Sequence, residues 1–297
     1  MDKYLIINAD DFGMCHSHNV ATMELFKCGG ITSSTIMACC PWANEAVKFA
    51  KANPQYAIGV HLTTTSEWSN YRWAPVNDEK TSTLRDSEGY MFHECDEFAN
   101  SADIEQVKGE IVAQIEKLKA LGLEPSHLDN HMGSLYGVDT GRFELLISTI
   151  ETAGKYSLPF RMPTTFTDAQ FGNDMLDIKI PKEMIDGLIG QIVQLGQVNK
   201  VAMPDYLLPG DWNGPQNDSY ENFREYIYEL YRTFEPGVTE TYIHPAVESD
   251  EIKGITGCWH RRVWEYKLFS DPKTKQHIDS LGIKLINYRD LKEMRGY

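Results

Sequence analysis

Short apolar runs alternate with longer segments of helical periodicity along almost the whole chain. The runs have the length and composition of strands and lie at residues 4–9, 33–38, 57–63, 126–130, 160–162, 201–206, 240–244 and 284–288. Helical patterns lie between them at residues 19–28, 42–52, 104–121, 142–153, 182–195, 220–234 and 263–281, and glycines at 29–30, 122 and 282 give three of these patterns a C-terminal stop. Such alternation predicts a mostly parallel sheet with helices outside it.

Seven or eight β/α units fit a TIM-like (β/α) barrel, closed or incomplete, better than an open two-layer sheet. No G-x-G-x-x-G or P-loop pattern follows the first strand, which weakens the case for a nucleotide-binding open sheet. A chain of 297 residues also suits one barrel. We therefore expect a single domain over residues 1–297, with its chemistry at the carboxyl ends of the strands.

One long polar interruption, at about residues 64–103, carries several aromatic side chains: Trp68, Tyr71, Trp73, Tyr90 and Phe92. Loops of this length inside a domain are usually functional or disordered, and aromatic residues argue against disorder. We expect an inserted cap beside the barrel mouth. The alternative is a surface excursion that packs its own aromatics. A second polar stretch, residues 208–220, is a candidate wall of the same mouth. Its Trp212 is a candidate for substrate binding.

Composition narrows the range of partners. The net charge of −15 and the lack of a Lys/Arg cluster argue against nucleic-acid binding. The sequence contains no run of about 18 apolar residues, so we expect no membrane span. The chain also enters its first strand without a signal-peptide pattern. The six cysteines form no C-x-x-C pair, so reduced thiols in a cytoplasmic protein are the simplest expectation.

The first strand ends in Asn8-Ala9-Asp10-Asp11-Phe12-Gly13. Neighbouring side chains on a strand point to opposite faces, so Asp10 and Asp11 are expected to have different roles. One would bind a metal and the other would act on a water molecule. The alternative is an Asx-type turn that uses these side chains for local hydrogen bonds.

Histidines stand at or near three other predicted strand ends: His61, His127, His131 and His244. A single histidine in such a place usually packs or hydrogen-bonds, but strand ends of a barrel meet at one mouth, which predicts a shared site. Two imidazoles and one carboxylate form a facial ligand set for a divalent metal with open positions. One carboxylate then remains as general base and one histidine as general acid. The other five histidines lie on predicted loops or helices and are expected to be surface or packing residues.

The order of motifs resembles the YdjC-like carbohydrate deacetylases, a family that includes the chitooligosaccharide deacetylases. The resemblance rests on residues 8–13 (N-A-D-D-F-G), 30–35 (G-I-T-S-S-T), 59–62 (G-V-H-L), 127–131 (H-L-D-N-H), 240–245 (E-T-Y-I-H-P) and 282–288 (G-I-K-L-I-N-Y). It implies a (β/α) barrel, often incomplete, that removes the N-acetyl group from a small N-acetylated amino sugar or chitooligosaccharide with Mg²⁺ or Zn²⁺. A homodimer is also plausible by this resemblance.

Carried onto this chain, the resemblance makes Asp11, His61 and His131 the metal ligands. Asp10 becomes the base that deprotonates water, and His244 the acid that protonates the amine or a group that stabilises the oxyanion. Arg161, in F-R-M-P, is similar to an element that orients the catalytic aspartate, although a structural ion pair would explain it equally. Many members continue the 127–131 motif with further histidines, whereas this chain has Met132-Gly133-Ser134 after His131, so its sugar contacts are expected to differ.

Three polar residues near the strand ends have open roles. His127 and Asp129 fit a shell that orients the ligands or the barrel core, and for His127 we favour the structural role. Asp205 is expected either to touch substrate or to cap a turn.

Two other functions stay open for the whole chain. One is another single-metal barrel hydrolase, a phosphoesterase or a cyclic-amide hydrolase. The other is a non-catalytic sugar-binding protein with a degenerate site.

Overall fold

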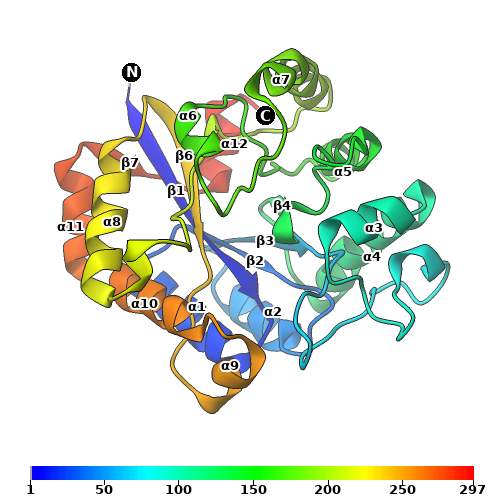
Figure 1. Ribbon diagram of the computed structural model, residues 1–297, viewed down its shortest axis with the longest axis horizontal. Coiled ribbons are helices and arrows are strands. Elements are labelled where there is room, and N and C mark those ends of the chain that lie inside the picture. Colours follow the sequence, from blue (N-terminus) through cyan, green and yellow to red (C-terminus); the bar gives the residue numbers. More distant parts are fainter. Residues whose placement is uncertain (1) are drawn as a thin grey trace.

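A computed structural model describes residues 2–297, and a parallel sheet around β1 organises it (Figure 1). The sheet runs in the order β4-β3-β2-β1-β6-β5, and β7 pairs with the first residues of β1. The predicted α/β class with an incomplete TIM-like barrel is confirmed. The strands are β1 (Lys3–Phe12), β2 (Ser33–Ile36), β3 (Ala57–Leu62), β4 (Leu128–Asn130), β5 (Tyr206–Leu207), β6 (Gly237–Ile243) and β7 (Ile283–Leu285).

The strand β1 is buried on both faces from residue 5 to residue 12, as expected for the central strand of a parallel sheet. Leu5, Ile7 and Ala9 pack in the large cluster between sheet and helices. Ile6 instead belongs to a small cluster with Val238 and Tyr288. Because side chains alternate along a strand, Asn8 and Asp10 follow Ile6 on the barrel-interior face. The interior therefore changes from apolar to polar towards the end of β1.

The barrel is irregular between β4 and β6. The predicted strand at 160–162 is reduced to an isolated bridge between Phe160 and Leu128, and of the one at 201–206 only Tyr206 is regular strand, in β5. Backbone hydrogen bonds still cross the gap, from Phe160 N–H to the Ala202 carbonyl (3.0 Å) and from Asp205 N–H to the Val238 carbonyl (2.9 Å). Prolines at 159, 163 and 204 remove ladder donors, which explains the irregularity.

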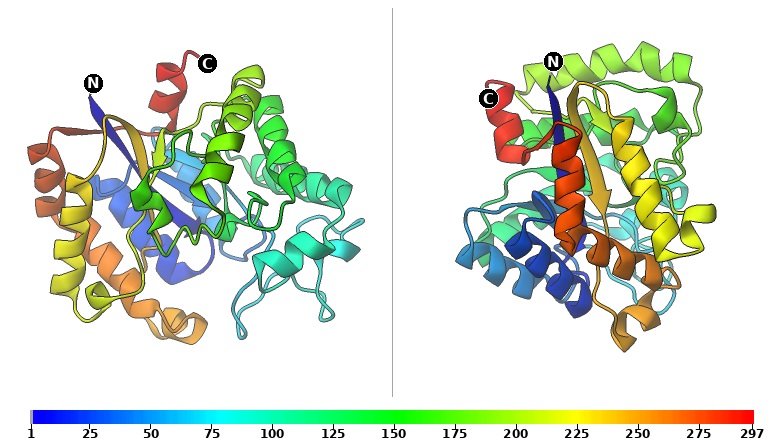
Figure 2. Two further views of the ribbon diagram at one scale, coloured as in Figure 1. Left: turned by 45° about the horizontal axis from the view of Figure 1, so that its top comes forward. Right: turned by 90° about the vertical axis from the view of Figure 1, so that its left-hand side faces the viewer.

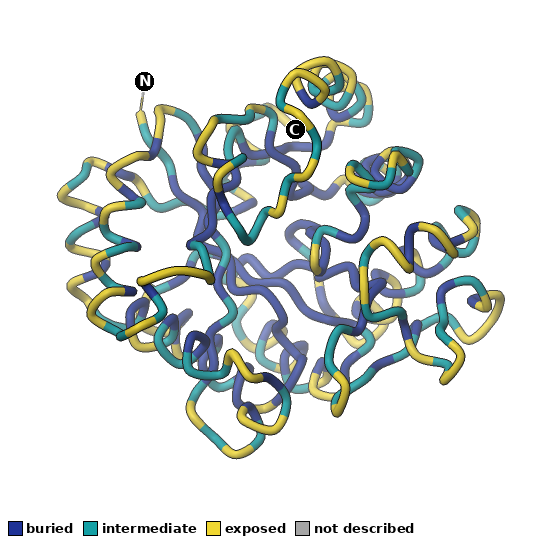
Figure 3. Tube along the Cα trace, viewed as in Figure 1, coloured by how far each residue is buried: buried dark blue, intermediate teal, exposed yellow. Residues whose placement is uncertain are grey.

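Helices form the outer layer around the sheet, and Figure 3 shows the buried strands inside a more exposed rim. The predicted helix at 104–121 is confirmed to the residue, with the Asp103 side chain accepting the N–H groups of Glu105 and Gln106 as a cap. The predicted helix at 263–281 is wrong in extent, because Asp271 and Pro272 end one helix and begin another. The helices are α1 (His16–Cys28), α2 (Ala43–Ala52), α3 (Cys95–Ser101), α4 (Ile104–Leu121), α5 (Phe143–Lys155), α6 (Asp168–Phe171), α7 (Lys182–Val198), α8 (Tyr220–Arg232), α9 (Asp250–Ile255), α10 (Trp259–Ser270), α11 (Pro272–Ser280) and α12 (Tyr288–Met294), with short 3₁₀ turns η1 (Ser82–Leu84), η2 (His131–Gly133) and η3 (Pro215–Asn217).

The two ends of the barrel differ. The strand β1 begins on the side where α12 lies and ends on the opposite side (Figures 1 and 2). The 64–103 segment follows β3, includes α3 and forms the cyan arm beside α4 in Figure 1. Among residues 2–297, no helix combines the length and apolar character that a membrane crossing requires.

The 64–103 segment is folded rather than loose. Thr65 and Phe92 form an isolated bridge, and the buried indole of Trp73 donates to the Thr65 carbonyl (2.7 Å). Glu110 of α4 accepts the backbone N–H groups of Val76 (2.8 Å) and Asn77 (2.9 Å), which attaches the segment to the outer layer. These contacts give its backbone polar groups protein partners, as a packed segment requires.

A glycine in β3 tests how closely this strand packs against the residues that lead into β4. A Cβ at Gly59 would come within 2.3 Å of the His127 carbonyl oxygen, a backbone atom that cannot move freely. We expect Gly59→Ala to lower the free energy of unfolding by about 1–3 kcal/mol or more, measured by urea denaturation.

Gly190→Ala in α7 is the control, because nothing lies within 4 Å of its added Cβ. Alanine favours a helix over glycine by about 1 kcal/mol, so this variant should gain stability. If the two variants changed stability equally, the register of β3 against residue 127 would be wrong.

Candidate active site

Side chains with metal-binding or acid–base chemistry gather where four strands end. Asp10 and Asp11 are near the end of β1, His61 is in β3, His131 follows β4, and His244 follows β6. The structure thus places side by side the aspartates and histidines that the sequence analysis assigned to one site.

Three of these side chains form a small triangle. Asp11 Oδ1 lies 3.4 Å from His61 Nε2 and 3.3 Å from His131 Nδ1, and the two nitrogens are 3.3 Å apart. All three residues are buried, and Asp11 Oδ1 has no hydrogen-bond donor among the described residues. A tetrahedral ion with bonds of about 2.0–2.1 Å has ligands about 3.3–3.4 Å apart. The triangle therefore fits one divalent metal ion.

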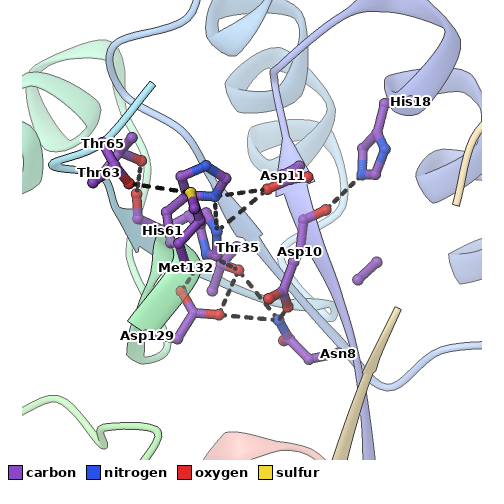
Figure 4. Close-up of polar contacts among 12 residues, drawn as sticks. Asn8, Asp10, Asp11, His18, Thr35, His61, Thr63, Thr65, Asp129 and Met132 are labelled. Carbon is purple, nitrogen blue, oxygen red and sulfur yellow. Dashed lines mark hydrogen bonds and ion pairs between the residues drawn. The ribbon is translucent and has the colours of Figure 1, made fainter. Parts of the chain in front are cut away.

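The backbone of β1 turns the two aspartates apart. The pairing of β1 with β2 shifts register between Ala9 and Phe12, and Asp11 has a φ of 60°. An aspartate tolerates this left-handed conformation better than most residues, and a bulge re-aims the side chains around it. Figure 4 shows the Asp11 carboxylate turned towards His61, whereas that of Asp10 points to Asn8.

Asp10 is held by an arginine through both oxygens. Arg161 donates from Nη1 to Oδ2 (2.7 Å) and from Nη2 to Oδ1 (2.6 Å), and Asn8 adds a third donor to Oδ1 (2.9 Å). Burial alone would raise the pKa of Asp10, but Arg161 outweighs it and lowers this pKa to about 2. Asp10 is therefore ionised at neutral pH and fixed in orientation.

The same guanidinium compensates two more buried carboxylates. Arg161 also contacts Asp129 (Nη2 to Oδ2, 2.9 Å) and Glu240 (Nε to Oε1, 2.7 Å). Asp10, His61 and Asp129 lie close enough to form a second group of potential metal ligands. The two carboxylates of this second group, Asp10 and Asp129, are already paired with the positive charge of Arg161. The Asp11 triangle is therefore the better cation site.

Each histidine of the triangle has a carboxylate at its other nitrogen. His61 Nδ1 lies 2.7 Å from Asp129 Oδ1, and His131 Nε2 lies 2.9 Å from Glu67 Oε2. Burial would lower both pKa values, but the surrounding carboxylates, Asp129 for His61 and Glu67 for His131, raise that of His61 to about 9 and that of His131 well above normal. The carboxylates that raise these pKa values favour positive charge at the triangle, which is supplied either by protons on the imidazoles or by a bound cation.

His244 lies in a different environment. Its backbone N–H donates to Glu265 (2.7 Å), and its ring meets the edges of Trp212 (centroids 5.4 Å apart) and Tyr242 (5.6 Å). Burial lowers the pKa of His244 to about 4, although Asp11 opposes this. Its Nδ1 has no partner among residues 2–297, so a neutral imidazole stands beside the triangle with a free polar atom.

Comparison with known proteins identifies the family of this chain. The family model described as YdjC-like protein matches residues 4–280. The chain belongs to the YdjC-like family. The resemblance predicted from the motifs is therefore confirmed.

Relatives in this family match over nearly their whole length. A protein named carbohydrate deacetylase from Thermoanaerobacter pseudethanolicus is 30% identical over 98% of this chain and 100% of its own. One named chitooligosaccharide deacetylase from Yersinia enterocolitica is 26% identical over 98% of this chain and 100% of its own. A crystal structure from Enterococcus faecalis, provisionally described as a cellobiose-phosphate cleavage protein, has a TM-score of 0.76 at 28% identity, covering 98% of this chain and 99% of that one.

Three further predicted residues of this YdjC-like chain lie around the site in different ways. Trp212 packs against His244. His127 lies inside the barrel, stacked on Tyr288 (3.8 Å) with its Nε2 3.1 Å from Asn8 Oδ1, and burial holds its pKa well below normal. Asp205 accepts from Val238 N–H (2.8 Å) and from Arg295 (2.7 Å), so its carboxylate is occupied by structural contacts.

Four contact residues were not identified from the sequence. Thr35 donates to Asp129 (2.7 Å), and Glu240 pairs with Arg161. Both residues belong to sequence motifs that the chain shares with the YdjC-like family, so these motifs are the signal that could have identified them. Glu67 in the 64–103 segment and Arg262 in α10 have no strand-end signal. Arg262 donates to Asp11 Oδ2 (2.9 Å). His18, expected on the surface or in packing, is buried and donates to the Asp10 carbonyl (2.5 Å).

Removal of the Arg161 charge tests the electrostatics of this site. Arg161→Met would leave three carboxylates buried without their cation, and we expect it to cost about 3–5 kcal/mol of unfolding free energy in urea. Arg161→Lys keeps a charge but loses the bidentate contact with Asp10, so its cost in unfolding free energy should be intermediate.

Arg224→Met is the matched control, because Arg224 pairs with Glu225 on the surface. Such pairs contribute about 0–1 kcal/mol. Equal costs for Arg161→Met and Arg224→Met would contradict the interpretation that Arg161 compensates the buried charges.

Proposed function

We propose that this protein is a metal-dependent hydrolase that removes the N-acetyl group from a small N-acetylated amino sugar or chitooligosaccharide and releases acetate. The observation that carries the proposal is the Asp11–His61–His131 triangle beside the ionised carboxylate of Asp10. The names of the relatives, carbohydrate deacetylase and chitooligosaccharide deacetylase, support the same reaction class.

Asp11, His61 and His131 would hold the ion. Two nitrogen donors and one oxygen suit Zn²⁺ better than Mg²⁺, which prefers oxygen ligands. A bound ion of this kind polarises a carbonyl group and lowers the pKa of water. The chain's own residues then have to position the acetamide, accept a proton and stabilise the oxyanion.

Asp10 is the proposed general base. A carboxylate offers about four acceptor sites, and three on Asp10 are used by Arg161 and Asn8, so one on Oδ2 remains for a water proton. Because its pKa is about 2, Asp10 is a weak base and depends on a water molecule that has been made more acidic. Arg161 is a positioning residue that keeps the carboxylate oriented and ionised.

His244 is the proposed partner of the oxyanion. A neutral imidazole has one N–H, and its low pKa favours hydrogen-bond donation to the oxyanion over delivery of a resident proton to the amine. The proton that Asp10 accepts from water is then available for the leaving amine. Trp212, at the edge of the His244 ring, offers an apolar face for a sugar ring.

The alternatives have weaker support. Phosphoester chemistry often uses two metals about 3.5–4 Å apart, but the second ligand group here is already paired with Arg161. No contact favours a cyclic amide over a linear one. A non-catalytic sugar-binding role is disfavoured by the complete set of two aspartates and three histidines.

Acetate release from N-acetylglucosamine oligomers, and from their phosphates, tests the base. We expect Asp10→Asn to lower kcat about 10²–10⁴-fold, while the protein still binds metal. Asp205→Asn is the control, since Asp205 contacts Val238 and Arg295 instead. Full activity of Asp10→Asn would refute the assigned base.

Metal removal tests the cofactor. We expect dialysis against a chelator to abolish acetate release and added Zn²⁺ to restore it, with one ion per chain by elemental analysis. His131→Ala should lose most of the bound metal. Activity that survives complete chelation would exclude the proposed metal dependence.

A further inference from the structure

We propose that Glu67 is a positioning residue for the metal ligand His131, so that the metal centre and the 64–103 segment stabilise each other. The inference rests on the proposed metal site and extends it to a segment that carries none of the three ligands. It begins from the contact between Glu67 Oε2 and His131 Nε2 at 2.9 Å.

The contact fixes which nitrogen of His131 is available to a cation. In a neutral imidazole, the form that binds a metal ion, an Nε2–H that donates to a carboxylate leaves the lone pair on Nδ1. In this structure, Nδ1 is the atom that faces Asp11 Oδ1 at 3.3 Å. Glu67 thus selects the required tautomer and ring orientation, as outer partners of metal-binding histidines generally do.

His61 provides the internal comparison. Asp129 contacts its Nδ1 at 2.7 Å, and Nε2 faces the triangle. Asp129 belongs to β4 and is held by Arg161 and Thr35, whereas Glu67 belongs to a long connection between β3 and α4. One histidine is therefore oriented by the barrel itself and the other by the inserted segment.

Trp68, the residue after Glu67, is linked to the third proposed ligand, Asp11, through Arg262. Arg262 donates to Asp11 Oδ2 (2.9 Å), which leaves Oδ1 for the triangle. The guanidinium carbon of Arg262 lies 5.5 Å from the Trp68 ring centroid, within the range of a cation–π contact. Two consecutive residues of the segment thus contact His131 and the arginine that holds Asp11.

The folded part of the segment keeps Glu67 in place. Ser66 N–H donates to the Phe92 carbonyl (2.7 Å), and Ser66 Oγ accepts from Trp73 N–H (3.1 Å). The Trp73 ring also lies edge-on to His131, with centroids 5.8 Å apart. If the segment opened, His131 would lose its carboxylate and this packing. Because such coupling is reciprocal, bound metal should hold the segment closed.

Zinc affinity measured by competition with a chromophoric chelator tests the inference. We expect Glu67→Ala to weaken binding about 10–100-fold. Glu67→Gln should recover part of the affinity, because its amide oxygen still accepts from His131 Nε2. Glu88→Gln, an exposed position on the same segment, is the matched control and should bind as the unsubstituted protein does.

Hydrogen–deuterium exchange gives a readout that does not depend on activity. Zinc should protect the peptide covering residues 65–73 in the unsubstituted protein, and Glu67→Ala should remove that protection. If Glu67→Ala bound zinc with unchanged affinity while His131→Ala lost it, the inference would be wrong and the proposed metal site would stand. If His131→Ala also kept full affinity, the metal site itself would be wrong.

Discussion

The guanidinium of Arg161 lies among carboxylates from three strands of the barrel, Asp10 of β1, Asp129 of β4 and Glu240 of β6. Removing several like charges from water is costly unless a counter-charge and hydrogen bonds accompany them. Arg161 enters from the irregular stretch between β4 and β5, where prolines prevent a regular strand. The interruption in the sheet is thus also the place where its interior charge is compensated.

This arrangement gives the two adjacent aspartates different chemistry. Asp10 is paired, ionised and oriented, whereas Asp11 keeps one oxygen without a donor and aims it at two imidazoles. Burial alone would raise the pKa of Asp11, but the His131 imidazole and the Arg262 guanidinium outweigh it and hold this pKa well below normal. A register shift and one left-handed residue in β1 lie where the two side chains diverge, and Arg161 and Arg262 then hold different carboxylates.

Local signals in the sequence predicted much of this arrangement. Apolar periodicity identified the strands and most helices, and the rule that parallel strands end at one mouth grouped Asp10, Asp11, His61, His131 and His244. Pro272 is a helix-starting signal in its own right, and it divides the long helix expected at 263–281 into α10 and α11. Glu67 and Arg262 could not be found in this way, because their positions depend on how a long insertion and the first turn of α10 pack. The homodimer and the cytoplasmic location stay predictions.

The position of a bound metal ion is the most direct test of the site formed by Asp11, His61 and His131. Anomalous diffraction at the zinc edge from a crystal of the zinc-loaded protein would locate it. We expect one strong peak bonded at about 2.0–2.2 Å to Asp11 Oδ1, His61 Nε2 and His131 Nδ1. A peak between Asp10, His61 and Asp129, with Arg161 displaced, would contradict it.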